Sequence, residues 1–238
     1  MPTFINASSA KTGAATSLSV TLNLQKNARV FVAVAFSGLS KTVTSMTDSV
    51  GTFYQQLGHA QLDSPNSVLA EFWSGVAPTT QSGVTITVTI SFAADMAVAA
   101  YQYSGITGLG QVIVVKRGNS TGAQIGLNPL LTRQSIAVAM FAIEIATASG
   151  VVGTPGTNVR VDSGPFTAPG AGVMEAAGTD SSSPTNGVIW TIYQSNETDW
   201  IGIAVEALGG PNTNQGNESK VRGPDVYGFQ QGLPGMEL

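Results

Sequence analysis

The sequence contains no cysteine, a single histidine, His59, and few charged residues. The absence of cysteine excludes thiol catalysis and cysteine-ligated metal, and it leaves the redox compartment undetermined. With one histidine, a metal site built from several imidazoles is excluded as well. Charged residues make up 10% of the chain, where about 25% is usual. The surface must therefore consist largely of Ser, Thr, Asn, Gln and Gly, as on extracellular proteins and on subunits covered by neighbours.

Basic patches, long apolar runs and a leader pattern are also missing. The net charge is −4 and lysine and arginine are scattered, which argues against nucleic acid as a partner. No apolar run approaches the roughly 20 residues of a membrane helix, so no membrane span is expected. Residues 1–13 lack a basic and then apolar leader pattern, so we expect that no cleaved signal exports the chain or that the signal has been removed. No cofactor is predicted.

The clearest strand in the sequence covers residues 83–92. Apolar side chains alternate there with Thr and Ser, which is the period of a half-buried β-strand. Residues 93–95 are too few for anything but a turn, and residues 96–103 predict a returning antiparallel strand. By the same criteria, residues 17–25 predict a strand after a loop at 11–16, and residues 118–128 predict irregular structure after a strand at 112–116.

This stretch occurs a second time. Shifted by 104 residues without a gap, residues 83–105 match residues 187–209. The same shift aligns residues 29–36 with 133–140 and residues 69–74 with 173–178, including Glu71 with Glu175. Because chance does not easily keep one register in three places, we interpret the pattern as an internal duplication.

About a dozen short strands separated by turns, with almost no helix signal, predict an all-β fold. The expected architecture is an antiparallel two-sheet β-sandwich, jelly-roll-like. Residues 1–208 would form it from two repeats, about 1–107 and 108–208, followed by an extended C-terminal tail at 209–238. Because the junction at residues 107–110 is too short for a free linker, one composite domain is expected rather than two independent ones.

Catalytic patterns are weak, and we predict no enzyme and no catalytic residue. Ser120 lies in a GNSTG match to the nucleophile elbow, but no helix follows it, so a pair with His59 is not expected. Glu71 and Glu175 could be imagined as a glycosidase pair. Carboxylates related by a repeat and set in apolar strands are more often structural or interfacial.

Calcium and sugar sites are open alternatives. Carboxylates suited to calcium occur without a D-x-D-x-D-G loop, at Asp48, Asp63, Asp95, Asp180 and Asp199. Aromatic residues suited to a lectin-like platform occur on several expected strands, at Trp73, Trp190, Trp200, Tyr101, Tyr103 and Tyr193. Aromatic residues on alternating strands are more often core or cross-strand pairs. Glycosylation sequons, expected in loops or termini, occur at Asn6, Asn119, Asn196 and Asn217.

The composition changes after residue 208. Residues 209–238 are rich in Gly, Pro, Asn and Gln, which predicts disorder unless the segment packs on a surface. The residues expected to anchor it are apolar or aromatic, namely Val226, Tyr227, Phe229, Leu233 and Met236. This tail either wraps its own sandwich or adds a strand to a neighbouring copy by β-augmentation.

Four segments together resemble a widespread bacterial module: RVFVAVAFSGL, VTSMTDSVGTFYQQL, LAEFWSGVAP and GVTITVTISFAADMAVAAYQYSGI. The module is a secreted or surface β-sandwich, mostly without assigned function, related in shape to jelly-roll and lectin-like folds. The resemblance covers about residues 15–208 and brings no catalytic motif. With its tail, the chain also resembles subunits of extracellular fibrils joined by strand exchange. Without a visible signal, a phage or virion structural protein stays open.

These features together favour a structural role. We expect a subunit of an extracellular or cell-surface filament, a helical assembly in which each tail packs as a donor strand on the next copy. The expected partners are other copies of the chain and glycans. The glycans would be either a covalent modification of the protein or a bound ligand. The alternatives are a carbohydrate-binding surface module and a virion structural protein.

Overall fold

The structure, a computed structural model, describes residues 2–38, 40–62, 68–127, 135–143, 157–162, 172–179 and 188–210. For residues 117–124, 127, 143, 157–162, 172–179 and 188–198 it describes the backbone alone. Across these ranges the chain forms strands and no helix, so the prediction of an all-β fold is confirmed. Every strand pairing is antiparallel.

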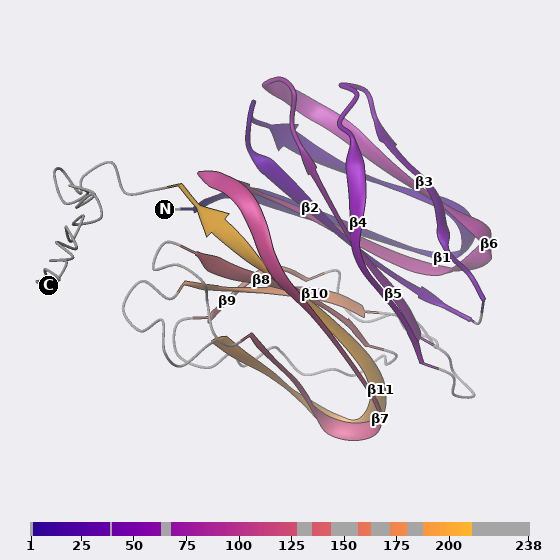
Figure 1. Ribbon diagram of the computed structural model, residues 1–238. Coiled ribbons are helices and arrows are strands. Elements are labelled where there is room, and N and C mark those ends of the chain that lie inside the picture. The colour runs from indigo at the N-terminus through magenta and orange to yellow at the C-terminus, as the bar shows by residue number, and fades with distance from the viewer. Residues whose placement is uncertain are drawn as a thin grey trace, which may run out of the picture.

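The strands form two sheets (Figure 1). The first sheet has the order β1 (Thr3–Leu24), β6 (Gln81–Ser104), β2 (Arg29–Ser37), β5 (Val68–Val76) and β4 (Tyr54–Leu62), with β3 (Val43–Asp48) also paired to β6. The second sheet has the order β7 (Ile106–Leu127), β11 (Val188–Gly209), β8 (Ile136–Ile143), β10 (Gly172–Thr179) and β9 (Thr157–Asp162). Taken in chain order, β3 aside, the strands of the two sheets are arranged in the same way. One residue, Gly105 with φ of 74°, joins the two sheets.

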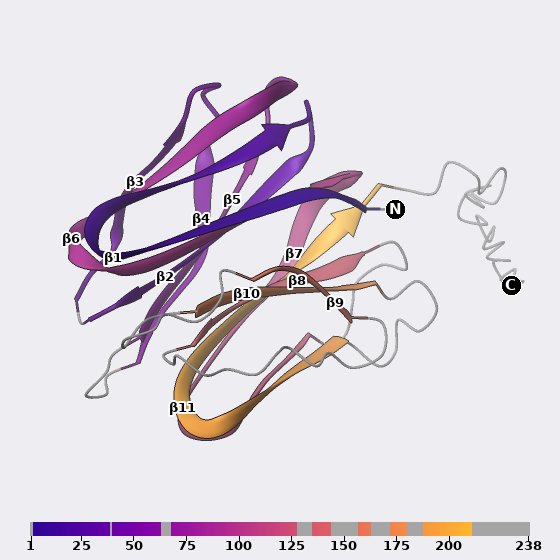
Figure 2. The same cartoon turned by 180° about the vertical axis from the view of Figure 1, so that it is seen from behind.

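The longest strands bend back over their own sheet (Figure 2). The prediction of a turn at residues 93–95 was wrong, because residues 81–104 form one strand, β6. Its early half pairs with β3 and with the end of β1, and its late half pairs with β2 and with the start of β1. The predicted loop at 11–16 and the predicted irregular structure at 118–128 were wrong for the same reason, since residues 11–16 lie within the bent strand β1 and residues 118–127 within the bent strand β7, while residue 128 lies outside the described residues.

The bend follows from the side-chain pattern of β6. Even-numbered residues from Val84 to Ala100 face one apolar cluster, with the exception of the exposed Phe92 in the bend. Odd-numbered residues are Thr at 85, 87 and 89, then Ala97, Ala99, Tyr101 and Tyr103, which face a second cluster. The early half is therefore half-exposed and the late half is buried on both faces. The strand curls toward the face that carries its even-numbered side chains. As a result, β3, the early half of β6 and the late half of β1 form an outer layer, and the first cluster lies between this outer layer and the rest of the sheet.

Both bends share one irregularity. Between Thr89 and Ala94 of β6, the partner on β1 advances only from Ser17 to Ala15. Between Tyr193 and Thr198 of β11, which lie 104 residues later, the partner on β7 advances only from Gly122 to Ser120. The extra residues on one strand produce a bulge, which bends the strand that carries it.

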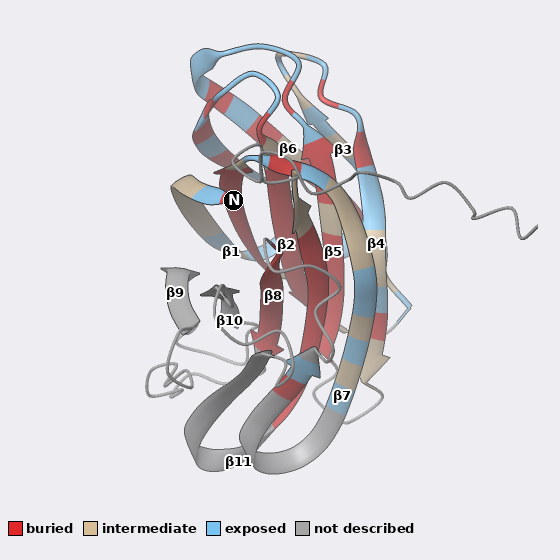
Figure 3. Ribbon diagram, turned by 60° about the vertical axis from the view of Figure 1, so that its left-hand side comes forward, coloured by how far each residue is buried: buried red, intermediate tan, exposed pale blue. Residues whose placement is uncertain are grey.

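Buried apolar residues of both sheets form one shared cluster. It combines β2, β4, β5 and β6 with β7, β8 and β11, and its members are buried. Figure 3 shows buried residues along β2, β5 and β8. The Tyr101 hydroxyl donates to the Ala139 carbonyl oxygen at 3.4 Å, and the Lys116 ammonium donates to the Gln61 carbonyl oxygen at 3.1 Å. Hydrogen bonds thus join the sheets both inside and beside this cluster.

The ungapped shift of 104 residues does not hold in every strand pair. Val34 lies opposite Val98 in the first sheet. Val138, which is 104 residues after Val34, lies opposite Val205 rather than Gly202. The two halves therefore share the same strand order. The register of β8 against β11, however, is shifted by three residues relative to the register of β2 against β6.

Candidate functional site

A buried carboxylate, that of Glu71, organises the polar cluster of the first sheet. Its side chain lies in β5 and has no exposed surface. Oε1 accepts hydrogen bonds from the Thr42 hydroxyl at 2.8 Å and the Val43 amide at 3.0 Å. Oε2 accepts from Gln56 Nε2 at 2.9 Å and from the Trp73 indole at 3.0 Å. His59 Nδ1 lies 3.4 Å from Oε1.

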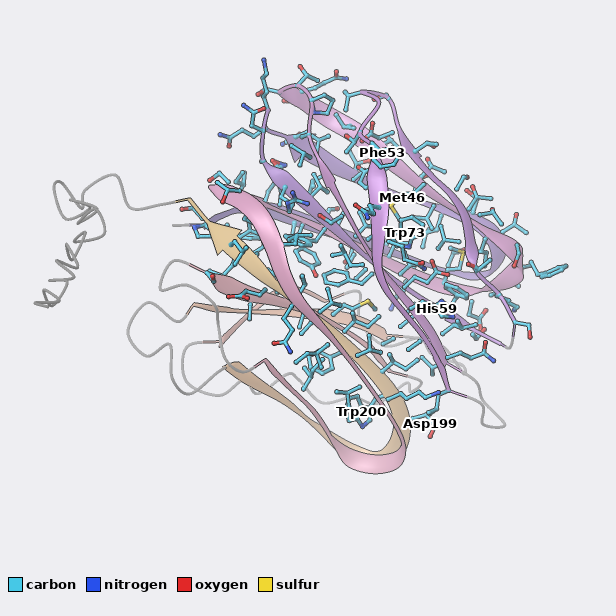
Figure 4. All side chains as sticks on the ribbon, viewed as in Figure 1. Met46, Phe53, His59, Trp73, Asp199 and Trp200 are labelled. Atoms are coloured by element: carbon cyan, nitrogen blue, oxygen red, sulfur yellow. The ribbon has the colours of Figure 1, made fainter. Side chains whose placement is uncertain are left out.

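The strand arrangement explains how these groups converge. Glu71 lies directly opposite His59 of β4, and Gln56 lies on the same strand. Thr42 and Val43 come from the outer layer at the start of β3. Figure 4 shows His59 and Trp73 along one side of the first sheet, close to β4. The cluster therefore ties the outer layer to the inner strands at the side where β3 and β4 are the last strands.

The geometry suits a structural role for the Glu71 carboxylate rather than a catalytic one. Each Glu71 oxygen accepts two hydrogen bonds, which occupies the roughly four acceptor sites of a carboxylate. A buried charge of this kind is tolerated because its donors replace water. The His59 side chain is 42% exposed, and its contact with Glu71 orients the ring. No second acid or nucleophile is brought to this imidazole by the contacts just described.

The other residues considered for catalysis lie elsewhere. Ser120 lies in β7 opposite Thr198, in the second sheet, whereas His59 lies in the first. Glu175 lies opposite Met140 of the shared cluster, and Glu71 lies opposite Val34 of the cluster under the outer layer. The two glutamates therefore do not occupy equivalent positions in their sheets, and the structure does not bring them together as a pair.

Three of the five aspartates considered for calcium are described, and two of them, Asp48 and Asp95, support local structure by hydrogen bonds. Asp48 Oδ1 accepts from the amides of Val50 and Thr52 at 3.0 Å each, and Oδ2 accepts from the Tyr54 hydroxyl at 2.8 Å. Asp95 Oδ1 accepts from the Ala14 amide across the bend of β1 and β6. Asp199 is buried in β11. Asp63 and Asp180 lie outside the described residues.

The protonation states of the Asp48 carboxylate and the Tyr54 phenol follow from these contacts. Burial alone would raise the pKa of Asp48, but the hydrogen bonds from Thr52, Tyr54 and Val50 outweigh it and hold the pKa below its usual value. Burial, and then the neighbouring Asp48 charge, raise the pKa of the Tyr54 phenol well above its usual range. At neutral pH the phenol therefore stays a donor to an ionised carboxylate.

The aromatic residues considered for a sugar platform are mostly interior where they are described. Tyr101 and Tyr103 belong to the shared cluster, and Tyr101 stacks on Phe31 with ring centroids 5.7 Å apart. Trp200 is buried against Phe141, and Trp73 is half-buried with its indole on Glu71. The side chains of residues 190 and 193 lie outside the description. Where they are described, then, these aromatics act as core.

Two of the four sequons do not lie in loops as predicted. Asn119 and Asn196 fall in β7 and β11, because the bent strands absorb segments that read as loops, and Asn6 lies near the N-terminus in β1. The Asn6 amide donates to the Asn23 carbonyl oxygen at 2.8 Å, which opposes its use as an acceptor of glycan. Asn217 lies outside the described residues, as do Val226, Tyr227, Phe229, Leu233 and Met236 of the predicted assembly tail.

Sequence reasoning missed the donors around Glu71 and two exposed aromatic side chains. A glutamate inside the apolar run LAEFWS is a usable signal, because a buried charge must be matched by donors. Nothing local in the sequence marks Thr42 or Gln56 as those donors, since they approach from other strands. Phe53 and Phe92 are 83% and 65% exposed, whereas the alternation around Phe92 predicts burial.

Within the described ranges, no helix is long and apolar enough to cross a membrane, and no group of three or more His, Asp or Glu side chains could hold a metal ion. Function has to be argued from the geometry of this chain alone. Compared with protein-family models, with curated proteins and with solved structures, the chain shows no match.

Proposed function

We propose that the protein is a structural subunit that joins copies of itself head to tail into an extracellular filament. The observation that carries the proposal is the outer layer of the first sheet. Its exposed face bears hydroxyl side chains and no charge, from Ser17, Ser19, Thr21, Ser45, Thr47, Thr85, Thr87 and Thr89. Ser19 and Thr87 hydrogen-bond to each other at 2.8 Å, so neighbouring strands keep these hydroxyls in rows.

The edges of this layer are suited to strand addition. Among the described strands, the late half of β1 and all of β3 pair on one side only, with β6. Residues 17–24 of β1 contain no charged residue, and β3 contains only Asp48, which is engaged in its turn. Natural proteins usually block such edges with lysine, proline or a covering element. An uncharged edge accepts an extended segment through main-chain hydrogen bonds.

The proposed donor is the tail of the next copy. Its aromatic residues, Tyr227 and Phe229, would set the register, and the backbone would supply affinity. Because a tail and an edge are different surfaces, the interface is heterologous and extends as an open helix unless the rotation closes. The resemblance to fibril subunits joined by strand exchange supports this proposal, and the low charge lets copies approach without strong repulsion.

The proposal includes the origin of the fold. We infer a two-sheet sandwich that arose by duplication, with one domain across residues 1–208. The repeated strand order and the repeated bulge support this inference.

Deletion of residues 211–238, which leaves β11 whole, tests the function by electron microscopy. We expect the full chain to form filaments and the truncated chain to stay monomeric, with unchanged circular dichroism. A synthetic tail peptide should bind the truncated chain. Filaments of the truncated chain, or a full chain that is monomeric at high concentration, would contradict the proposal.

A further inference from the structure

The two halves of the chain are separate units in their strand pairing. Among the described strands, every hydrogen-bonded pair lies either within the first half, β1 to β6, or within the second half, β7 to β11. Gly105 alone joins the last strand of the first half to the first strand of the second. Pairing continues up to this glycine on both sides, through Ser104 in β6 and Ile106 in β7. One residue therefore connects two units that share no strand pair.

The contacts between the halves occur in reciprocal pairs. By their place in each sheet, β7, β11, β8, β10 and β9 are the counterparts of β1, β6, β2, β5 and β4. β4 contacts β7, and their counterparts β9 and β1 also contact each other. In the same way, the contact of β5 with β11 has its counterpart in β10 with β6, and that of β5 with β8 in β10 with β2. This reciprocity is the pattern of an isologous contact, in which both partners use the same surface.

Non-covalent groups hold the halves together. The first half supplies buried rings such as Phe31 and Tyr101, and the second half supplies buried aliphatic side chains such as Ile201 and Ile203. The Tyr101 hydroxyl also donates to the Ala139 carbonyl oxygen of the second half at 3.4 Å. The second half of another copy carries the same aliphatic side chains and the same acceptor. It would therefore fit the first half as well as the second half of the same chain does.

We propose that copies of this protein exchange halves with Gly105 as the hinge, so that the second half of each copy packs on the first half of the other. The resulting dimer keeps every strand pair and every contact of the shared cluster. The one change is at Gly105, whose φ of 74° becomes that of extended backbone. Such swapping is a low-cost route to a dimer, and a short hinge promotes it. Because it uses neither the tail nor the edges of the outer layer, it is independent of the filament contact proposed above.

The conformation of Gly105 decides which form prevails. Its φ lies in the left-handed region, which glycine adopts readily and other residues adopt only at a cost. In the wild type, the short connection gives the two halves a high effective concentration for each other, which favours contact within one chain. A side chain at this position penalises that form and leaves the extended hinge of the dimer unaffected. Gly105→Ala should therefore lower the protein concentration at which half of the chains are exchanged about 10–100-fold.

Disulfide formation detects the exchange, because the chain has no cysteine of its own. A Cβ on Gly58 of the first half would come within 2.8 Å of Ile203 Cγ2 of the second half. Full-length chains with Gly58→Cys and full-length chains with Ile203→Cys are mixed in urea, refolded together at several concentrations and oxidised by air. Because Ile203 is fully buried, a cysteine at this position meets one at residue 58 of another chain only after exchange. A denaturing gel then measures the covalent dimer.

Three reference samples define the range of this measurement. Both cysteine substitutions in one chain give the intrachain disulfide of the unexchanged form. Gly58→Cys refolded alone gives the background of dimers that do not involve the second half. Gly83→Ala is the matched control for the hinge, since Gly83 has φ of 66° and no atom within 4 Å of an added Cβ, but lies inside β6. Its backbone cost is therefore the same in both forms and leaves the exchange unchanged.

The hinge is tested with two substitutions of graded effect. Circular dichroism first checks that every variant folds like the wild type. Gly105→Asn is the milder change, because asparagine tolerates positive φ better than alanine does. We expect the covalent dimer to increase with concentration in every background. Gly105→Ala should need the lowest concentration, then Gly105→Asn, then the wild type and Gly83→Ala together.

Two results would overturn the exchange of halves. One is a covalent dimer that stays at background in both Gly105 variants at every concentration. The other is an equal yield in these variants and in Gly83→Ala, since the hinge would then not control the contact. Filaments that form without covalent dimer would overturn this inference and leave the proposed function in place. Covalent dimer without filaments would support this inference and count against the proposed function.

Discussion

The two halves of the molecule present different side chains to the cluster that they share. In β6 the residues facing it are Ala97, Ala99, Tyr101 and Tyr103, and in β11, 104 residues later, they are Ile201, Ile203, Val205 and Ala207. Where one half has a small side chain, the other has a larger one. Phe31 and Phe72 add two more rings on the side of the first half. The two faces are therefore complementary in side-chain size rather than identical. This favours packing of one half against the other half over packing of either half against a copy of itself.

A second difference concerns polar residues buried at corresponding positions. Gln102 of β6 accepts from the Gln25 amide at 2.9 Å and donates to the Asn23 carbonyl oxygen at 3.2 Å. Glu206, 104 residues later in β11, is equally buried, and a Cβ on Gly110 would come within 2.5 Å of its Oε2. A carboxamide can both donate and accept, whereas a carboxylate only accepts. The two sheets therefore carry chemically different buried groups at this position of their long strands.

The largest expected effect comes from removing a ring on the aromatic side. Phe72→Ala should lower the free energy of unfolding by about 3–5 kcal/mol. Because both sheets line this cluster, the two halves should unfold in one transition, with Trp73 and Trp200 as fluorescent reporters. Urea titration measures this. Two separate transitions, of which only one moves, would show that the halves are independent.

Replacement of the buried Glu71 carboxylate should have the next largest effect on the free energy of unfolding. Glu71→Gln keeps the shape but turns an amide group toward at least one of the four donors, which should cost about 2–4 kcal/mol. Ser19→Ala, which removes only an exposed hydrogen bond, serves as control and should change the free energy of unfolding by about 0.5 kcal/mol or less. If Glu71→Gln changed the free energy of unfolding as little as the control does, the hydrogen-bonded cluster around Glu71, which connects β3 and β4, would not stabilise the fold.

The contact between halves can be tested at a glycine. A Cβ on Gly58 would come within 2.8 Å of Ile203 Cγ2 in the second sheet. Gly58→Ala should therefore force β4 away from β11 and cost about 1–3 kcal/mol. Gly108→Ala places its Cβ at an ordinary 3.6 Å from Leu208 and provides the matched control in thermal unfolding. Equal melting temperatures for the two variants would argue against close packing at Gly58.

The smallest effect is expected at the Asp48 turn, through pH. Because the folded-state pKa of Asp48 is lowered, its contribution is present above the unfolded pKa of about 3.9. It is lost as pH falls through the folded value. Asp48→Asn should cost about 1 kcal/mol at pH 7 and reduce the loss of stability on acidification. Chemical unfolding at pH 7 and pH 3 checks this, and an unchanged acid dependence would contradict it.

Local patterns predicted the strands well where one face is buried and the other is not. The strands predicted at residues 83–92, 96–103 and 112–116 lie within the observed β6 and β7, and the strand predicted at 17–25 matches the end of β1 to within one residue. The bends were missed because short side chains such as those of Ala93, Ala94 and Asp95 suit a turn and a bulge equally. What decides between them is the cluster that the strand encloses, and its members are distant in sequence.

The candidate site was predictable only in part. Glu71 could be singled out from its apolar surroundings, and Trp73 lies two residues along the same strand. Thr42 and Gln56, however, reach Glu71 through pairings that no local pattern encodes. Phe92 was expected inside because it continues the apolar face of residues 84–90. The bulge, a product of how β6 pairs with β1, turns it outward.

The central claim, that copies of this chain associate end to end, is tested most directly by sedimentation velocity of the full-length protein over a wide range of concentration. The account predicts that the 24.4 kDa species gives way, as concentration rises, to a continuing series of larger particles. A single 24.4 kDa species at every concentration, or growth that stops at a dimer, would contradict the claim.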